Sequence, residues 1–177
     1  KFYKFSENLI CASEFIEKSI RAYQWYAPAC FNMYRRDFLL QNELFFKVGI
    51  YFEDMQMLPR VFLAAQKIAC MDGVFYHYVV RENSIMTSQK DTKKKNNSIQ
   101  NLREWKEQFD HVQDAELRKI LYGMLVKCYL HECRVYGITK WEIDGVDFKF
   151  VVNNSLNFKE KIKGLLFALL PKCYVRV

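Results

Sequence analysis

A polar stretch of ten residues, 88–97, divides this chain into two parts with different sequence patterns. The stretch has four lysines and no apolar residue, so it lacks the side chains that anchor a segment to a core. The part before it mixes helical and strand-like periodicities, whereas the part after it is mostly helical. We therefore predict a first portion at 1–88, a linker at 89–97 and a helical region at 98–177.

The size and composition of the chain predict a folded protein. Its 177 residues can bury one ordinary core, or two small ones, without disulfide support, and 51% of them are hydrophobic. Six cysteines include no Cys-x-x-Cys pair, and Cys128 and Cys133 have only His131 nearby, which is poor zinc-ligand spacing. We interpret all six as reduced, buried, small apolar residues.

Neither a signal peptide nor an apolar stretch of membrane-spanning length occurs in the sequence. Together with the reduced cysteines, this predicts a cytoplasmic protein, with peripheral attachment to the inner face of the membrane as a further expectation. The sequence opens at Lys1 rather than at a methionine, so we expect that an upstream part precedes it.

In the first portion we expect helices and a small β element. Ser13 is a suitable N-cap for a helix that runs to about residue 25, and a short helix is expected at 34–43. An aromatic loop at 45–52 then leads to a helix that opens at Asp54 and runs to about residue 67. A short strand is expected at 1–5.

The apolar runs 68–71 and 74–80 flank Asp72-Gly73, a dipeptide that favours a hairpin turn. In the second portion, Leu102, Trp105 and Phe109 predict one helix, and a second is predicted from Asp114 to Gly137. Residues 141–153 are ambiguous, and a last helix at 158–173 is interrupted by Pro171. The whole reads as a predominantly helical α+β fold.

Three motifs in the first portion occur in a particular order. Cys30 begins the run Cys-Phe-Asn-Met-Tyr-Arg-Arg-Asp-Phe-Leu, Asp54 ends the run Tyr-Phe-Glu-Asp, and Phe-Tyr-His-Tyr at 75–78 is followed by Arg81 and Ser84. In order and spacing, this set resembles the acceptor half of family 2 glycosyltransferases. The resemblance covers about residues 27–88 and implies the acceptor side of a GT-A fold.

The resemblance implies that Asp54 is the general base of an inverting glycosyl transfer. A base must lie within hydrogen-bond reach of the acceptor hydroxyl, and a carboxylate at a helix N-terminus is held in place by backbone contacts. The helix dipole should lower the basicity of this carboxylate. Glu53 has three open roles: it orients Asp54, contacts the acceptor, or caps the helix. A bare Glu-Asp pair is otherwise an ordinary helix cap.

The resemblance also assigns His77, Arg81 and Ser84 to contacts with the donor diphosphate or the acceptor. Strand-like alternation would place His77 on the opposite face from Tyr76 and Tyr78. The alternative for His77 is a structural residue, and for Arg81 and Ser84 an exposed arginine and a turn serine. Arg81 can meet a diphosphate through its planar guanidinium.

The donor-binding half expected of such an enzyme is absent from this sequence. There is no Asp-x-Asp, which the family uses to hold a divalent metal, Mg or Mn, and Asp144 and Asp147 lack that spacing. There is also no glycine-rich phosphate loop. The expected partners are a nucleotide-sugar donor and a glycan or lipid-linked acceptor in polysaccharide synthesis. We expect this fragment to hold no metal and to be inactive alone.

Basic residues are clustered in this chain, whose formal charge is +7. Lys159, Lys161, Lys163 and Lys172 surround a leucine-rich segment, which is either a core helix or a basic amphipathic helix on an anionic membrane. The alternative function is a non-catalytic helical module that docks anionic membranes or phosphates through its lysine clusters. No nucleic-acid partner is expected, because nothing except charge supports one.

Overall fold

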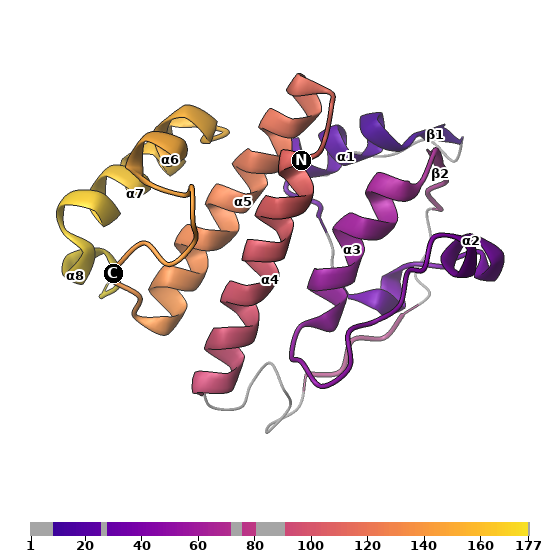
Figure 1. The fold of residues 1–177 in the computed structure, drawn as a ribbon, viewed down its shortest axis with the longest axis horizontal. Helices are drawn as coiled ribbons and strands as arrows, with labels where there is room; N and C mark the ends of the chain where they lie inside the picture. Colours follow the sequence, from indigo (N-terminus) through magenta and orange to yellow (C-terminus); the bar gives the residue numbers. More distant parts are fainter. Residues whose placement is uncertain (1–8, 26–27, 72–75, 81–90, 177) are drawn as a thin grey trace. The chain divides into compact units, whose positions relative to one another are not determined.

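The structure is a computed structural model that describes residues 9–25, 28–71, 76–80 and 91–176. The described residues form eight α-helices, one 3-10 helix and one two-stranded antiparallel sheet. The predicted α+β, predominantly helical class is therefore confirmed. The chain divides into two compact units, Lys1–Lys94 and Lys95–Val177 (Figure 1).

The first unit is built around α1 (Ala12–Arg21) and α3 (Glu53–Ala64), which pack together. Their facing sides bury Ile16, Ile20 and Leu58. Phe62 of α3 forms edge-to-face ring contacts with Phe15 at 5.2 Å and with Trp25 at 5.1 Å between centroids. These contacts fix α3, and with it the position of the Glu-Asp pair at its start.

The limits of α1 differ from those predicted. Ser13 lies inside the first turn rather than at the N-cap, which is Cys11. The helix ends at Arg21 rather than near residue 25, because Tyr23 takes a left-handed backbone conformation with φ of 58°. Tyr23 is exposed.

The predicted hairpin is wrong for the residues that the structure describes. β2 (Lys67–Ile68) pairs with β1 (Ile10–Cys11), in the register Ile10 to Ile68 and Cys11 to Lys67. Residues 76–80 form no strand and are exposed. The Asp72-Gly73 turn and the strand expected at 1–5 lie outside the described residues. β2 thus pairs with a strand that is distant in the sequence, and local turn signals cannot predict such a pairing.

Two further elements of the first unit precede α3. A 3-10 helix, η1 (Ala29–Phe31), is followed by α2 (Arg36–Gln41), which is shorter than the helix predicted at 34–43. The predicted loop at 45–52 has no helix or strand. α3 accommodates Pro59 in its interior and begins at Glu53, six residues before that proline.

The predicted linker is partly wrong, because α4 (Thr92–Asp110) already includes Thr92–Asn97. The carboxylate of Asp91 accepts a hydrogen bond from the backbone amide of Lys94 at 2.7 Å, as an N-terminal cap does. This cap starts the helix inside the polar stretch. Further along α4, the residues that predicted the helix, Leu102, Trp105 and Phe109, are buried.

The second unit continues with α5 (Ala115–Tyr136), which has the predicted ends. Asp114 accepts hydrogen bonds from the amides of Glu116 and Leu117, and Gly137 closes the helix with φ of 66°. Within the ambiguous stretch the chain forms α6 (Phe148–Asn154), capped by Asp147. The last predicted helix is split at Pro171 into α7 (Phe158–Leu169) and α8 (Pro171–Tyr174).

An aromatic cluster holds α7 and α8 against α5. Phe167 of α7 lies with its ring centroid 4.6 Å from that of Trp141, 6.3 Å from that of Tyr129 and 5.7 Å from that of Tyr174. The Tyr174 hydroxyl donates to the carbonyl of Leu130 at 2.9 Å. One face of α7 is therefore firmly packed.

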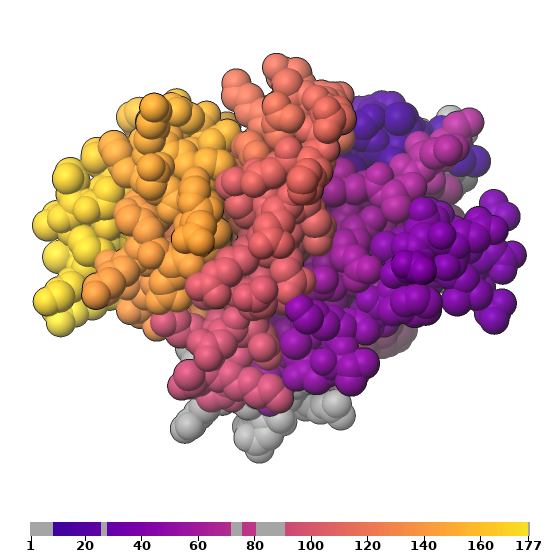
Figure 2. Space-filling model, viewed as in Figure 1, coloured from indigo at the N-terminus to yellow at the C-terminus, as the bar shows by residue number. Residues whose placement is uncertain are grey.

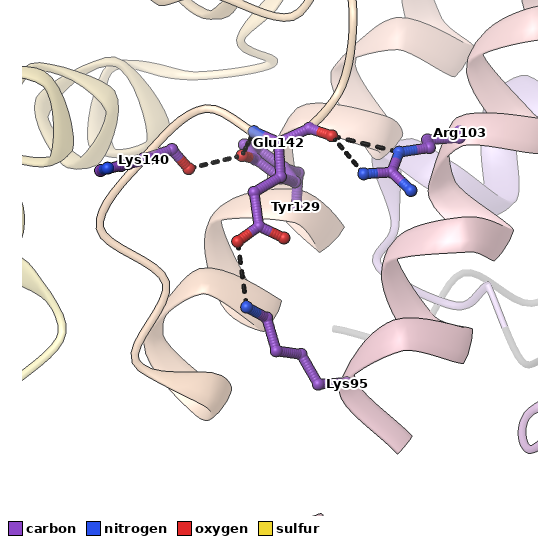
Figure 3. A network of polar contacts seen from close by, with 5 residues as sticks. All are labelled: Lys95, Arg103, Tyr129, Lys140 and Glu142. Atoms are coloured by element: carbon purple, nitrogen blue, oxygen red, sulfur yellow. Dashed lines mark hydrogen bonds and ion pairs between the residues drawn. The ribbon is translucent and has the colours of Figure 1, made fainter. Parts of the chain in front are cut away.

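A polar network attaches the loop before α6 to α4 and α5 (Figure 3). The carbonyl of Glu142 accepts from Arg103 Nε and Nη2, and its carboxylate pairs with Lys95 at 3.0 Å. The Tyr129 hydroxyl accepts from the amide of Glu142 at 2.8 Å and donates to the carbonyl of Lys140 at 3.2 Å. Every member of this network has a structural partner.

The cysteines are all unpaired, but the prediction that they are buried is wrong for half of them. Cys11, Cys30 and Cys173 are exposed, Cys70 and Cys128 are partly buried, and Cys133 is buried. No helix among the described residues combines the length and apolar character needed to cross a membrane.

Candidate functional site

The Glu-Asp pair follows a loop with unusual backbone conformations. Between α2 and α3, Glu43, Gly49 and Phe52 have φ values of 52°, 80° and 61°. Phe52 is the N-cap of α3, and a left-handed residue there turns the chain sharply into the helix. Asp54 is therefore the second residue of α3, in the turn where backbone amides are free of helical partners.

Arg60 fastens this loop to α3. Its Nη1 donates to the carbonyl of Phe45 and its Nη2 to the carbonyl of Glu43, both at 3.1 Å. A weaker contact of 3.4 Å joins Arg60 to the side chain of Gln56. Sequence reasoning missed Arg60, because its partners are backbone carbonyls, which leave no residue pattern. It is a positioning residue for the segment that leads into Asp54.

The carboxyl of Asp54 is half-buried, whereas Glu53 is exposed. Burial raises the pKa of Asp54 above its ordinary value, the Met55 amide hydrogen bond at 2.7 Å lowers it, and the charge of Glu53 raises it again. The backbone contacts at the helix N-terminus lower the pKa, in the expected direction, but the net shift of the pKa is upward. Loss of water around the carboxylate outweighs the backbone contacts.

Tyr34 lies close enough to Asp54 to sense its charge. Burial raises the pKa of the Tyr34 phenol, a hydrogen bond from the Asn32 side chain lowers it, and the charge of Asp54 raises it. Tyr34 precedes α2 by two residues and belongs to the first of the three motifs. The structure thus brings the first and second motifs together.

The third motif contacts the first through two aromatic rings. Phe31 and Tyr76 meet edge to face at 5.5 Å between centroids, and both side chains are about half exposed. His77 follows Tyr76 in the irregular segment 76–80 and is exposed, so it is not a buried structural histidine. Arg81 and Ser84 lie outside the described residues.

Two lysines of the polar stretch lie beside the residue that begins the second motif. The ammonium groups of Lys93 and Lys94 are 5.3 and 5.7 Å from the ring centroid of Tyr51. Tyr51 is three residues before Asp54. Sequence reasoning assigned these lysines to a linker and so did not connect them with the Glu-Asp pair.

The C-terminal lysines do not share one environment. Lys159, Lys161 and Lys172 are exposed. Lys163 is partly buried and pairs with the carboxylate of Glu160 at 3.0 Å, so its charge is compensated within α7. Asp147, considered above for metal spacing, is engaged as the cap of α6.

Within the described parts of the chain, no group of three or more His, Cys, Asp or Glu side chains could hold a metal ion. The arrangement around Asp54 instead offers a half-buried carboxylate of raised basicity, a neighbouring phenol and exposed aromatic rings. Comparisons with protein-family models, with curated proteins and with solved structures find no match.

Proposed function

We propose that this chain is the acceptor-side and C-terminal part of an inverting family 2 glycosyltransferase, in which Asp54 is the general base. The proposal takes its reaction from the resemblance of the three motifs. The observation that carries it is the half-buried Asp54 carboxylate, with its raised pKa, at the start of α3. Carboxylates whose pKa is shifted by desolvation cluster at functional sites.

The proximity of the three motifs in the folded chain supports the same proposal. Tyr34 of the first motif senses the charge of Asp54 in the second, and Phe31 of the first contacts Tyr76 of the third. Segments that lie twenty or more residues apart in the sequence are therefore gathered in one unit. Local secondary structure alone does not require this gathering.

The chemistry assigned to Asp54 is proton removal. An acceptor hydroxyl oxygen forms a bond to the anomeric carbon of the donor sugar, while the bond from that carbon to the nucleoside diphosphate breaks. The hydroxyl proton passes to the Asp54 carboxylate, and the diphosphate leaves with the electron pair. A raised pKa makes the carboxylate a better proton acceptor as long as it is ionised.

Neighbouring residues have supporting roles in this proposal. Glu53 raises the basicity of Asp54 through its charge and remains a candidate for acceptor contact. The exposed faces of Phe31, Tyr76 and Tyr78 provide surfaces on which an acceptor sugar can stack. The exposed Lys93 beside Tyr51 favours an anionic group such as the donor diphosphate, whereas Lys94 is buried.

The divalent metal implied by the resemblance is expected at the donor-binding half, and the described residues contain no cluster of ligands for it. We therefore derive no step through a metal. His77, Arg81 and Ser84 keep their proposed contacts with the diphosphate or the acceptor. Cytoplasmic activity in polysaccharide synthesis, with a nucleotide sugar and a glycan or lipid-linked acceptor as partners, belongs to the same proposal.

The test uses the full-length product of the native gene. Purified enzyme is incubated with a panel of nucleotide sugars, Mg²⁺ or Mn²⁺ and a membrane extract as acceptor source, and nucleoside diphosphate release is measured. Asp54→Asn should lower release by at least about a hundredfold, because it keeps the shape but cannot accept the proton. Asp37→Asn is the matched control, since Asp37 also lies in the first turn of a helix but is exposed. Full release by Asp54→Asn would exclude it as the base.

A further inference from the structure

Five apolar side chains form a continuous stripe along the outer side of α7, and nothing in the described chain covers it. The α7 stripe consists of Phe158, Ile162, Leu165, Leu166 and Leu169, each at least 42% exposed. An α-helix turns by about 100° per residue, so the five fall within an arc of about 100°. Such an arc is the usual width of the face that a helix buries.

The opposite side of α7 is the side that packs on the protein. Phe167 sits in the aromatic cluster with Trp141, Tyr129 and Tyr174. Gly164 allows α7 to approach α6 so closely that an added Cβ would lie 2.3 Å from Val151 Cγ1. α7 therefore has a buried face already, and the α7 stripe is a second apolar face. The alternative that this segment is simply a core helix does not account for the stripe.

Basic side chains border the α7 stripe on both sides. At about 100° per residue, Lys159 falls on one flank and Lys161 on the other. Beyond the end of α7, exposed Lys172 and Arg176 add two more positive charges. Glu160, the acid of α7, is buried on the packed side and paired with Lys163. In Figure 2 the orange-to-yellow segment that contains α7 and α8 lies at the surface.

We infer that α7 and α8 dock on an anionic membrane surface, with the α7 stripe inserted among the acyl chains and the flanking lysines at the phosphates. Charge complementarity favours an anionic membrane over a protein as the partner of the α7 stripe. A protein would have to place acidic side chains along both edges of the stripe, whereas anionic lipid phosphates surround any inserted helix. A helix with one apolar face and basic flanks lies in the plane of the interface rather than across the membrane. The inference does not depend on the role of Asp54.

The experiment is co-sedimentation of the 177-residue chain with vesicles of phosphatidylcholine, with and without phosphatidylglycerol. Binding should require phosphatidylglycerol and should weaken as salt is added. The double variant Leu166→Gln, Leu169→Gln should lower the partition coefficient at least about tenfold, because two inserted side chains are lost. The control is Met33→Gln, Val48→Gln, which removes two other exposed apolar side chains and should bind as the parent does.

A charge-reversal pair tests the electrostatic part. Each basic side chain at an anionic surface contributes about fivefold, so Lys159→Glu, Lys161→Glu should lower binding by about thirtyfold or more. Lys119→Glu, Lys149→Glu changes the net charge equally at two other exposed lysines and should lower it by less than about threefold. Equal losses in both pairs would show attraction by net charge alone and overturn the inference.

Two other outcomes also overturn the inference of membrane docking. One is that the parent chain fails to bind phosphatidylglycerol vesicles at low salt. The other is that light scattering detects a dimer of the parent chain, which Leu166→Gln, Leu169→Gln disrupts. The second result would assign the α7 stripe to contact between two copies. Because the substituted side chains are exposed, all variants should keep the parent's unfolding temperature, which shows that any loss of binding is local.

Discussion

The carboxyl of Asp54 is half-buried in the folded chain, and this burial disfavours its ionised form. Its carboxyl loses water on folding, which raises its pKa, and the Met55 amide offsets only part of that effect. Between the ordinary pKa of 3.8 and the raised folded value, the folded state holds more protons than the unfolded state. The contribution of Asp54 to stability therefore falls as the pH rises through that window.

Replacing Asp54 by asparagine should consequently stabilise the 177-residue chain at neutral pH. Asparagine keeps an oxygen that accepts from the Met55 amide but carries no charge to desolvate. We expect a higher midpoint of urea unfolding than for the parent at neutral pH, and a smaller difference as the pH approaches 3.8.

The control for that measurement is Asp37→Asn, which alters an exposed carboxylate and should leave the neutral-pH midpoint nearly unchanged. If Asp54 were only a favourable charge at the helix N-terminus, its replacement would lower the midpoint instead. A lower midpoint for Asp54→Asn at neutral pH would contradict our account of this residue.

At the scale of elements, glycine positions decide how closely the C-terminal helices approach. A Cβ at Gly164 of α7 would lie 2.3 Å from Val151 of α6, and a Cβ at Gly123 of α5 would lie 2.4 Å from Leu156. Contacts this short cannot exist, so the neighbouring side chains or the helices that carry them would have to shift. The aromatic cluster around Phe167 leaves little space for such a movement.

Gly164→Ala should therefore destabilise the second unit despite the better helix propensity of alanine. Overpacking of this kind costs about 1–3 kcal/mol, against a propensity gain of about 1 kcal/mol. Chemical unfolding followed by Trp fluorescence measures the difference. Leu165→Ala is the control on the same helix, because its side chain is exposed and its loss should change stability little. A Gly164→Ala variant as stable as the parent would show that α6 and α7 are not tightly packed.

The elements that the sequence predicts well are those defined by local signals. The ends of α5 follow from Asp114 and Gly137, and the break at Pro171 follows from proline itself. The start of α4 was missed because its cap, Asp91, lies inside a polar stretch that reads as a linker. The strand pairing was missed because β1 and β2 are separated by more than fifty residues.

In the candidate site too, the sequence predicts the features that depend on local signals and misses those that depend on tertiary contacts. Asp54 and its helix follow from the motif, and the resemblance groups Tyr34 with it. The raised pKa of Asp54 depends on burial by tertiary packing, which no local pattern specifies. The contacts of Arg60 with two carbonyls and of Lys93 with Tyr51 likewise arise only in the folded chain.

At the scale of the whole molecule, the two proposals concern different units. The proposed base lies in Lys1–Lys94 and the proposed membrane-docking surface in Lys95–Val177. Catalysis in the proposed enzyme also needs a donor-binding half that this sequence does not contain. Each proposal therefore has its own test, and failure of one leaves the other standing.

The measurement that tests the central claim most directly is the pH profile of kcat/KM for the full-length enzyme and its Glu53→Gln variant. If Asp54 is the base, kcat/KM rises as Asp54 ionises, so the acidic limb reports its pKa. Glu53→Gln removes a negative charge that raises this pKa, and the limb should move to lower pH. Asp37→Asn should leave the limb in place. An acidic limb that stays at the same pH in an active Glu53→Gln enzyme would contradict the assignment of Asp54 as the base.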